Sequence, residues 1–174
     1  CKEITEQLGE MIRDILNTSR LQVQSNSEPA TMLSMEEILL DLCEPYQLIA
    51  KTKKIQFEMD ILDDISVYLP ENQLKKAISN ILSNAVNYTE AGRKISVTLD
   101  GKKLSIHNEC DALSPEQLEH IFEPFYRPDL ARNRETGGNG LGLYIVQTIL
   151  DKLHLKYRFV PMKKAKGMDF TIYF

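Results

Sequence analysis

The chain has 174 residues, of which 43% are hydrophobic and 26% are charged, and its formal net charge is −4. This composition predicts a soluble globular domain with a sizeable core and an appendage, and it excludes a disordered chain. The basic residues are scattered along the sequence, so no electrostatic surface for nucleic acid is expected.

The cysteines and the apolar runs indicate the compartment. Three cysteines without CxxC spacing argue against a disulfide framework or a zinc site and favour a reducing cytosol. No apolar run approaches the roughly 20 residues that are needed to cross a bilayer. Because the chain begins at Cys1 and not at a methionine, we expect it to be a piece of a longer protein.

The N-terminal residues predict an appendage that is separate from the main domain. Residues 2–24 repeat apolar side chains at steps of four and three, which is typical of a helix with a bundle-forming face. Residues 25–31 are polar and carry serines and a proline, so they are expected to form a linker. The main domain is then expected over residues 32–174.

The next segments predict one helix and two strands. Ser34 can cap a helix together with Glu37, three residues further on. The buried face of this helix is expected to carry Ile38, Leu42 and Ile49. Residues 55–59 and 65–69 look like a pair of short strands around an acidic turn.

The remaining elements alternate between helices and strands. In chain order they are a helix from Pro70 to about Tyr88, a hairpin over 94–100 and 103–108, a helix capped by Ser114, a helix ending near Leu153, and closing strands over 155–161 and 168–174. This order predicts an α+β fold, a two-layer sandwich with helices over one face of a mixed, largely antiparallel sheet.

A glycine-rich stretch, "TGGNGLGLYIV", precedes the last expected helix. Glycines that open a helix often hold phosphate, because main-chain N–H groups and the helix dipole converge on an anion. The common templates do not fit. Gly142 is followed by Leu143 instead of the lysine of a P-loop, and Leu143 also replaces the third glycine of a dinucleotide fingerprint. The alternative is a simple hinge at the helix entry.

Three asparagines, Asn80, Asn84 and Asn87, lie opposite the apolar face of the helix after Pro70. Asparagine costs about half a kcal/mol of helix propensity relative to alanine, so three in register favour a function. A neutral amide oxygen suits Mg²⁺, which takes few protein ligands and completes its shell with water and substrate phosphates. The alternative is an ordinary exposed polar face.

The segment "ISNILSNAVNYTEAG" resembles the N box of sensor histidine kinases, an ATP-binding family shared more distantly with DNA gyrase and mismatch-repair ATPases. The resemblance implies a Bergerat-type fold and the cofactors ATP and Mg²⁺. It makes Asn84 the metal ligand, Asn80 a support of the phosphate end, Asn87 a phosphate contact and Tyr88 an aromatic neighbour of the nucleotide. Hydrolytic relatives have a glutamate at the position of Asn80, so phosphoryl transfer is expected instead of hydrolysis.

A second motif, "HNECDALSPEQLEHIF", stands where the family usually has Asp-x-Gly-x-Gly. The alignment puts Asn108 in the aspartate position and Cys110 and Ala112 in the glycine positions. Asparagine can both accept from the adenine amine and donate to a ring nitrogen. Side chains at Cys110 and Ala112, and Met168 where a Thr or Ser is usual, are expected to affect affinity. The alternative for Asn108 is a turn residue at a strand end.

The segment "FEPFYRPDLARNRETGGNGLGL" resembles the family's F box, ATP lid and second glycine box. The resemblance makes Phe122 and Phe125 anchors of the lid and Arg127 and Arg132 the cations that neutralise the transferred phosphoryl group, with Arg134 nearby. The residues expected to close the loop over the nucleotide, or to anchor it, are Gly138, Gly140, Leu141 and Gly142. The alternative for the arginines is a solvated charged loop.

No histidine of the chain stands in a phosphoacceptor context, whereas the N-terminal helix resembles the second dimerisation helix of the family. We therefore expect a catalytic domain that transfers the γ-phosphoryl group of ATP to a histidine on a segment absent from this chain, for relay to a response-regulator aspartate. The full protein is expected to be a bacterial, membrane-anchored homodimer with this part in the cytoplasm.

Narrower and rival interpretations are also open. The lid and Asn108 are most similar to those of vancomycin-resistance sensors. One rival is a hydrolytic ATPase of the same fold, which needs an acidic residue at position 80. The other is a non-catalytic interaction module, suggested by Asn108, Cys110, Ala112 and Met168.

Overall fold

The computed structural model describes residues 28–128, 139–163 and 165–174, together with Gly9 and Ile12, which are helical. Its elements are β1 (Thr31–Ser34), α2 (Met35–Thr52), β2 (Gln56–Asp63), β3 (Ser66–Leu69), α3 (Glu71–Tyr88), β4 (Lys94–Asp100), β5 (Lys103–Asn108), α4 (Pro115–His120), α5 (Gly142–Lys152), β6 (Lys156–Pro161) and β7 (Met168–Tyr173). Apart from Gly9 and Ile12, the expected N-terminal helix lies outside the described residues, as do Arg132, Arg134 and Gly138.

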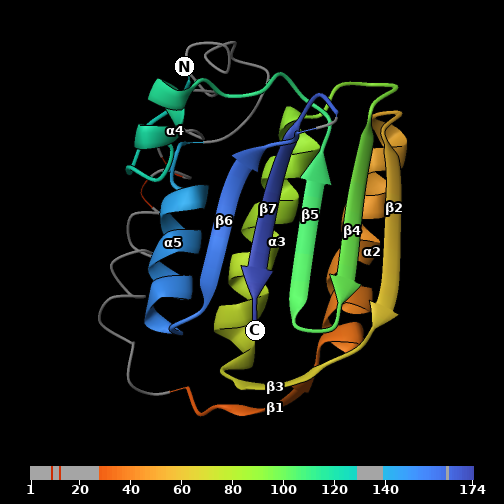
Figure 1. The fold of residues 1–174 in the computed structure, drawn as a ribbon, viewed down its shortest axis with the longest axis vertical. Helices are drawn as coiled ribbons and strands as arrows, with labels where there is room; N and C mark the ends of the chain where they lie inside the picture. Colours follow the sequence, from red (N-terminus) through yellow and green to blue (C-terminus); the bar gives the residue numbers. More distant parts are fainter. Residues whose placement is uncertain (1–8, 10–11, 13–27, 129–138, 164) are drawn as a thin grey trace.

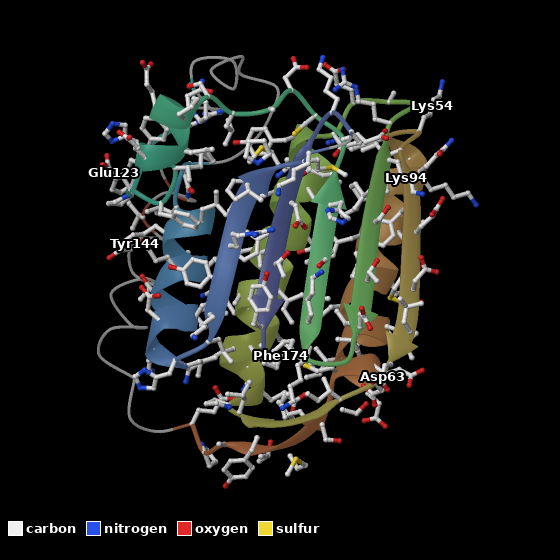
Figure 2. All side chains as sticks on the ribbon, in the orientation of Figure 1. Lys54, Asp63, Lys94, Glu123, Tyr144 and Phe174 are labelled. Atoms are coloured by element: carbon white, nitrogen blue, oxygen red, sulfur yellow. The ribbon has the colours of Figure 1, made fainter. Side chains whose placement is uncertain are left out.

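Five of the described strands form one sheet in the order β2-β4-β5-β7-β6, in which only β2 and β4 run parallel. The helices α2, α3 and α5 lie on one face of this sheet (Figure 1). The other face carries side chains that project away from the helices (Figure 2). The predicted α+β, two-layer architecture is confirmed.

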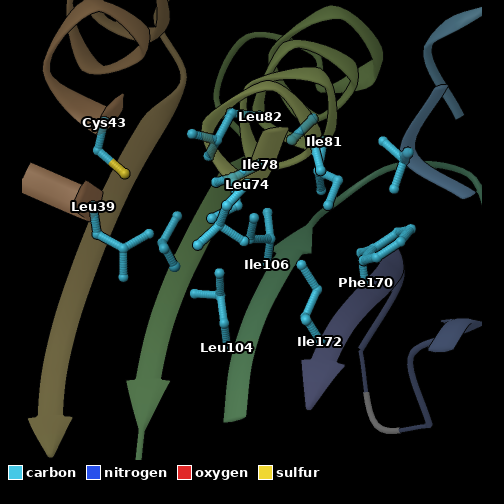
Figure 3. Packing of buried hydrophobic residues seen from close by; sticks show 14 of the residues in the cluster. Leu39, Cys43, Leu74, Ile78, Ile81, Leu82, Leu104, Ile106, Phe170 and Ile172 are labelled. Atoms are coloured by element: carbon cyan, nitrogen blue, oxygen red, sulfur yellow. The ribbon is translucent and has the colours of Figure 1, made fainter. Parts of the chain in front are cut away.

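The core lies between α3 and the middle of the sheet. Strand β4 alternates buried and partly exposed residues, and its buried residues Ile95, Val97 and Leu99 are fully shielded from solvent. The facing side of α3 carries the apolar residues that the sequence pattern predicts, among them Leu74, Ile78 and Leu82 (Figure 3). Burial of this face leaves the asparagines of α3 on its opposite side.

The predicted helix caps at Ser34 and Ser114 are confirmed. Ser34 Oγ accepts from the main-chain N–H of Glu37 at 3.2 Å. Ser114 and Gln117 form a complete capping box, in which each side chain accepts from the other residue's main-chain N–H. These bonds satisfy N–H groups that have no partner within their helix.

The predicted pairing of strands 55–59 and 65–69 is wrong. Strand β2 instead pairs with β4, and β3 pairs with β1 in a separate two-stranded sheet. The intervening Asp64 explains the separation, because its carboxylate accepts from Ser34 Oγ at 3.1 Å and from the main-chain N–H of Glu36 at 2.9 Å. These bonds hold the chain at the start of α2, so β3 leaves the direction of β2. The four-residue β1 begins at the last residue of the expected linker and was not predicted, because so short a segment shows no periodicity.

The expected buried face of α2 needs one correction. Ile38 is buried and Leu42 packs against the core, but Ile49 is 45% exposed. The buried positions of this helix are Met35, Ile38, Leu39, Cys43 and Ala50. Near the end of the helix, Ala50 faces the core. Because successive residues of an α-helix are about 100° apart around its axis, the preceding Ile49 points toward solvent.

Among the helices that the structure describes, none combines the length and the apolar character that crossing a membrane requires.

Candidate functional site

The asparagine face of α3 lies against the first residue of α5. A side chain at Gly142 would place its Cβ only 3.3 Å from Asn84 Oδ1 and 3.5 Å from Asn80 Oδ1. The two helices pack side by side. Glycine at position 142 therefore allows the beginning of α5 to approach both asparagine amides.

The two amides differ in how they are held. Asn80 Nδ2 donates to the carbonyl oxygen of Lys76 at 2.8 Å, which directs its Oδ1 away from the helix backbone. Asn84 is half-buried, and within the described part of the chain its amide has no hydrogen bond. The Asn84 amide is therefore accessible, and its Oδ1 can accept a ligand at this place.

The start of α5 adds main-chain donors to these amide oxygens. The first N–H groups of a helix lack acceptors within it, and the helix dipole favours an anion there. Among the described residues, no cluster of three His, Cys, Asp or Glu side chains could hold a metal ion by itself. The chemistry fits Mg²⁺ that is bound by an amide oxygen and by phosphate and water, which is how this ion usually binds.

Asn87 and Tyr88 lie further along α3. Asn87 is half-buried and its Nδ2 is 3.5 Å from Ser83 Oγ, while the Tyr88 side chain is 37% exposed at the end of the helix. The structure therefore brings Asn80 and Asn84 together with Gly142, and it places Asn87 and Tyr88 closer to the loop that follows α3.

A second polar centre lies where α3 and β5 end. Asn108, the last residue of β5, is buried, and its Nδ2 is 3.4 Å from Thr89 Oγ1. The Thr89 hydroxyl donates in turn to the carbonyl oxygen of Ala85 at 2.7 Å. Sequence reasoning missed Thr89. The signal for it was a hydroxyl residue directly after the helix that carries the asparagines.

The residues in the expected glycine positions differ in burial. Cys110 is buried and Ala112 is exposed. Burial raises the pKa of the Cys110 thiol, and a hydrogen bond from Asn108 opposes that rise. Met168 is buried and pairs with Asn108 across β7 and β5. Cys110 and Met168 thus fill space around Asn108 with soft apolar side chains.

The main chain closes the base of the expected lid. The N–H of Phe125 donates to the carbonyl oxygen of Gly140 at 3.0 Å. Gly140 has a φ of 77°, and a Cβ there would lie 2.7 Å from the carbonyl carbon of Phe125. Glycine is therefore required for this close approach.

The side chains near the lid base have different roles. Phe122 packs edge-on against Tyr157, with ring centroids 5.8 Å apart, and Leu141 is buried in the core. The Phe125 ring is 46% exposed, so its contact with the lid base is made by its main chain. Arg127 is half-buried beside this base.

The three histidines have different surroundings. On the open face of the sheet, His107 Nδ1 lies 2.9 Å from Asp169 Oδ1. Burial would raise the pKa of Asp169, but His107 and the Thr171 hydroxyl together lower it below its usual value. His120 pairs with Glu123 on the surface, and His154 is exposed. These environments fit the expectation of structural or exposed histidines.

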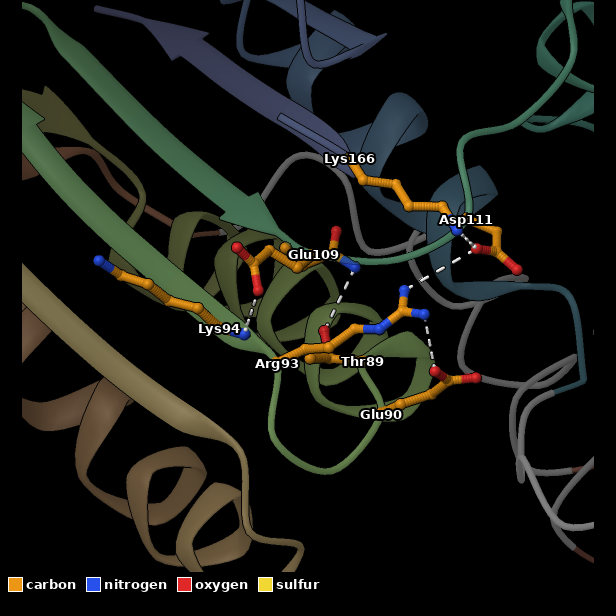
Figure 4. Close-up of polar contacts among 8 residues, drawn as sticks. Thr89, Glu90, Arg93, Lys94, Glu109, Asp111 and Lys166 are labelled. Atoms are coloured by element: carbon orange, nitrogen blue, oxygen red, sulfur yellow. Dashed lines mark hydrogen bonds and ion pairs between the residues drawn. The ribbon is translucent and has the colours of Figure 1, made fainter. Parts of the chain in front are cut away.

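Charged side chains surround the Asn108 end (Figure 4). Asp111 contacts Lys166 at 2.7 Å and Arg93 at 3.8 Å, and Arg93 also contacts Glu90 at 2.9 Å. The charge of Lys166 and its hydrogen bond lower the pKa of Asp111. Since these groups are substantially exposed, their pairing adds little to stability.

Comparison with known proteins identifies relatives of the chain. Residues 70–174 match the family of histidine kinase-, DNA gyrase B- and HSP90-like ATPases. The sensor histidine kinase RppB of Synechocystis sp. is 34% identical over 95% of this chain and 37% of its own length. The chain thus spans little more than a third of the length of such curated relatives, at 37% of RppB.

Solved structures show the same fold. The catalytic domain of the histidine kinase ThkA has a TM-score of 0.70 and 23% identity, over 82% of this chain and 93% of that one. Full-length ShkA in complex with AMPPNP has a TM-score of 0.79 and 23% identity, over 98% of this chain and 36% of that one. These relatives do not support the narrower resemblance to vancomycin-resistance sensors.

The turn before β7 provides a test of how the Asn108 end is built. Gly167 has a φ of 150°, and a Cβ there would lie 2.3 Å from the carbonyl oxygen of Asn108. We predict that Gly167→Ala lowers the free energy of unfolding by about 2 kcal/mol, because strain at such a position costs about 1–3 kcal/mol. Urea unfolding measures this change.

Gly92→Ala is the matched control. Gly92 also has a positive φ, 83°, but a Cβ there has nothing within 4 Å. This variant should lose only about 1 kcal/mol, the cost of the left-handed conformation alone. Equal losses in both variants would contradict the close contact between Gly167 and Asn108.

Proposed function

Because the chain belongs to the family of histidine kinase-, DNA gyrase B- and HSP90-like ATPases, we propose that it is the ATP-binding catalytic part of a sensor histidine kinase. ATP binds with its phosphates between α3 and the start of α5, and its adenine beside Asn108. The observation that carries the proposal is the half-buried Asn84 amide, which faces Gly142 at the helix start.

The phosphate end supports transfer of a phosphoryl group. Asn84 Oδ1 is the proposed ligand of Mg²⁺, which would neutralise phosphate charge, and Asn80 directs its own Oδ1 toward the same place. An amide cannot take a proton from water, so position 80 lacks the general base of a hydrolase. The acceptor is therefore a nucleophile that another segment supplies.

The proposed reaction is transfer to a histidine. A ring nitrogen of that histidine forms a bond to the γ-phosphorus, the bond between this phosphorus and the β–γ bridging oxygen breaks, and ADP leaves. Arg127 and Arg132 are the proposed cations that stabilise the charge of the transferred group. Asn87, Tyr88, Phe122 and Phe125 are proposed to support the nucleotide or its lid.

The partners follow from the same proposal. The phosphorylated histidine belongs to a dimerisation helix, and the phosphoryl group then passes to a response-regulator aspartate. Residues 1–24 form part of the dimerisation domain, 25–31 the linker and 32–174 the catalytic domain. The full protein is a membrane-anchored bacterial homodimer with this part in the cytoplasm. Similarity to vancomycin-resistance sensors stays a prediction.

One observation favours a second candidate function. Cys110 is buried beside Asn108, where the family usually has a glycine, and Met168 also fills this region. A chain altered in this way could be an interaction module that has lost its nucleotide. A titration with ATP, with and without Mg²⁺, separates the two. Absence of binding at millimolar ATP would contradict the kinase proposal and favour the interaction module.

A substitution on α3 tests the magnesium ligand. We predict that Asn84→Ala weakens ATP binding at least about tenfold in Mg²⁺ and much less in EDTA, because one contact to a charged group contributes about 1.5–3 kcal/mol. Calorimetric titration in both buffers measures the effect. Asn72→Ala is the control, since Asn72 is exposed about three turns earlier on the same helix. A loss of equal size in EDTA would contradict the metal role.

A labelling experiment tests where the acceptor lies. We predict that this chain alone gains no stable label from ATP carrying a radioactive γ-phosphate, because its three histidines lie outside a phosphoacceptor context. The measurement is the acid-labile radioactivity that remains on the chain after gel separation. Such radioactivity on His107, His120 or His154 would show that the acceptor is in this chain.

A further inference from the structure

We propose that Thr89 determines the nucleotide base that this chain selects, by fixing which end of the Asn108 amide faces the ligand. The inference rests on the proposed nucleotide site. It concerns whether that site presents a hydrogen-bond donor or an acceptor to the base. An asparagine amide can present either, whereas an ionised aspartate presents only acceptors. Thr89 acts through Asn108 and is therefore a positioning residue.

The first hydrogen bond that sets this orientation lies at the end of α3. The Thr89 hydroxyl donates its proton to the carbonyl oxygen of Ala85 at 2.7 Å. A hydroxyl has one proton, so toward any other neighbour Thr89 Oγ1 can only accept. Thr89 is 5% exposed, which leaves little access for water to replace either bond. Oγ1 is thus a fixed acceptor.

The fixed acceptor decides the orientation of Asn108. Asn108 Nδ2 faces Thr89 Oγ1 at 3.4 Å and can donate to it. If the amide were turned, Oδ1 would face Oγ1, and two acceptors would then repel each other. A hydrogen bond from the Asn108 side chain also lowers the pKa of the Cys110 thiol. Cys110 is thus a second neighbour of the Asn108 side chain besides Thr89.

The main chain limits any rotation of the residue as a whole. Asn108 is 8% exposed, and Gly167 lies so close to its carbonyl oxygen that a Cβ could not fit between them. The neighbouring Glu109 donates its main-chain N–H to Lys94. Since the backbone is held, exchange of Oδ1 and Nδ2 requires only a turn about the last side-chain bond. Thr89 opposes that turn.

The resulting site presents an acceptor to the base. With Nδ2 engaged, Oδ1 can accept from the 6-amino group of adenine but meets the 6-oxo group of guanine unfavourably. A turned amide would present Nδ2, which suits guanine O6. Thr89 therefore favours adenine over guanine, although Asn108 by itself could bind either base.

The test compares ATP and GTP on the whole chain. Thr89→Val keeps the shape of the side chain but removes the acceptor, so the ratio of the Kd for GTP to the Kd for ATP should fall about five- to tenfold, the scale of one hydrogen bond. Thr89→Ser keeps the hydroxyl and should retain the ratio. Calorimetric titration gives both constants, and thermal unfolding shows whether each variant is folded.

A second background separates orientation from packing. In Asn108→Asp the two carboxylate oxygens are equivalent acceptors, so Thr89→Val should change the ratio far less in that background than in the original chain. An unchanged ratio in Thr89→Val, or an equal change in both backgrounds, would overturn the inference. If the unaltered chain binds neither ATP nor GTP, the proposed nucleotide-binding function itself is wrong. If the unaltered chain prefers ATP and Thr89→Val has the same preference, only the proposed role of Thr89 is wrong.

Discussion

The close approach of α5 to the asparagine face of α3 is the constraint on which the proposed site depends. Gly142 begins α5 so close to the Asn80 and Asn84 amides that even a Cβ there would touch both, at 3.5 and 3.3 Å from their Oδ1 atoms. The burial of Leu141 and Ile145 fixes this position from the core side. Main-chain donors of a helix start and amide oxygens of a second helix therefore meet at one place, where phosphate and a hard cation can be bound together.

Helix α3 also relates the two ends of the site to each other. Asn84 lies at the phosphate end and Thr89 follows the helix at the base end, a separation of about 7.5 Å along the axis at 1.5 Å per residue. The apolar face of the same helix is buried against the sheet. Because one packed element carries both groups, the distance between phosphate and base does not depend on the conformation of the lid.

The sequence predicted the two-layer fold well where periodicity and caps agreed, as at Ser114 and along α3. It failed for β2 and β3, because the bonds from Asp64 to Ser34 and Glu36 that separate these strands join residues distant in the sequence. The asparagine face was visible from spacing alone. Its close approach to Gly142 was not predicted and emerged from the fold, and the role of Thr89 emerged only from hydrogen-bond directions. The spacing of residues in the sequence can reveal a polar helix face, whereas the hydrogen-bond partner of a polar side chain can be identified only once the fold is known.

The central claim is that phosphate binds beside Asn84 and the start of α5, and that the base binds beside Asn108 and Thr89, where α3 ends. Backbone NMR spectra of the isotope-labelled chain, recorded during titration with Mg²⁺ and AMPPNP, test it most directly. The largest shifts are predicted at Asn84, Gly142 and Asn108, with little change at Thr98 and Ser105 on the open face of the sheet. Shifts centred on that open face, or no shifts at millimolar nucleotide, would contradict the claim.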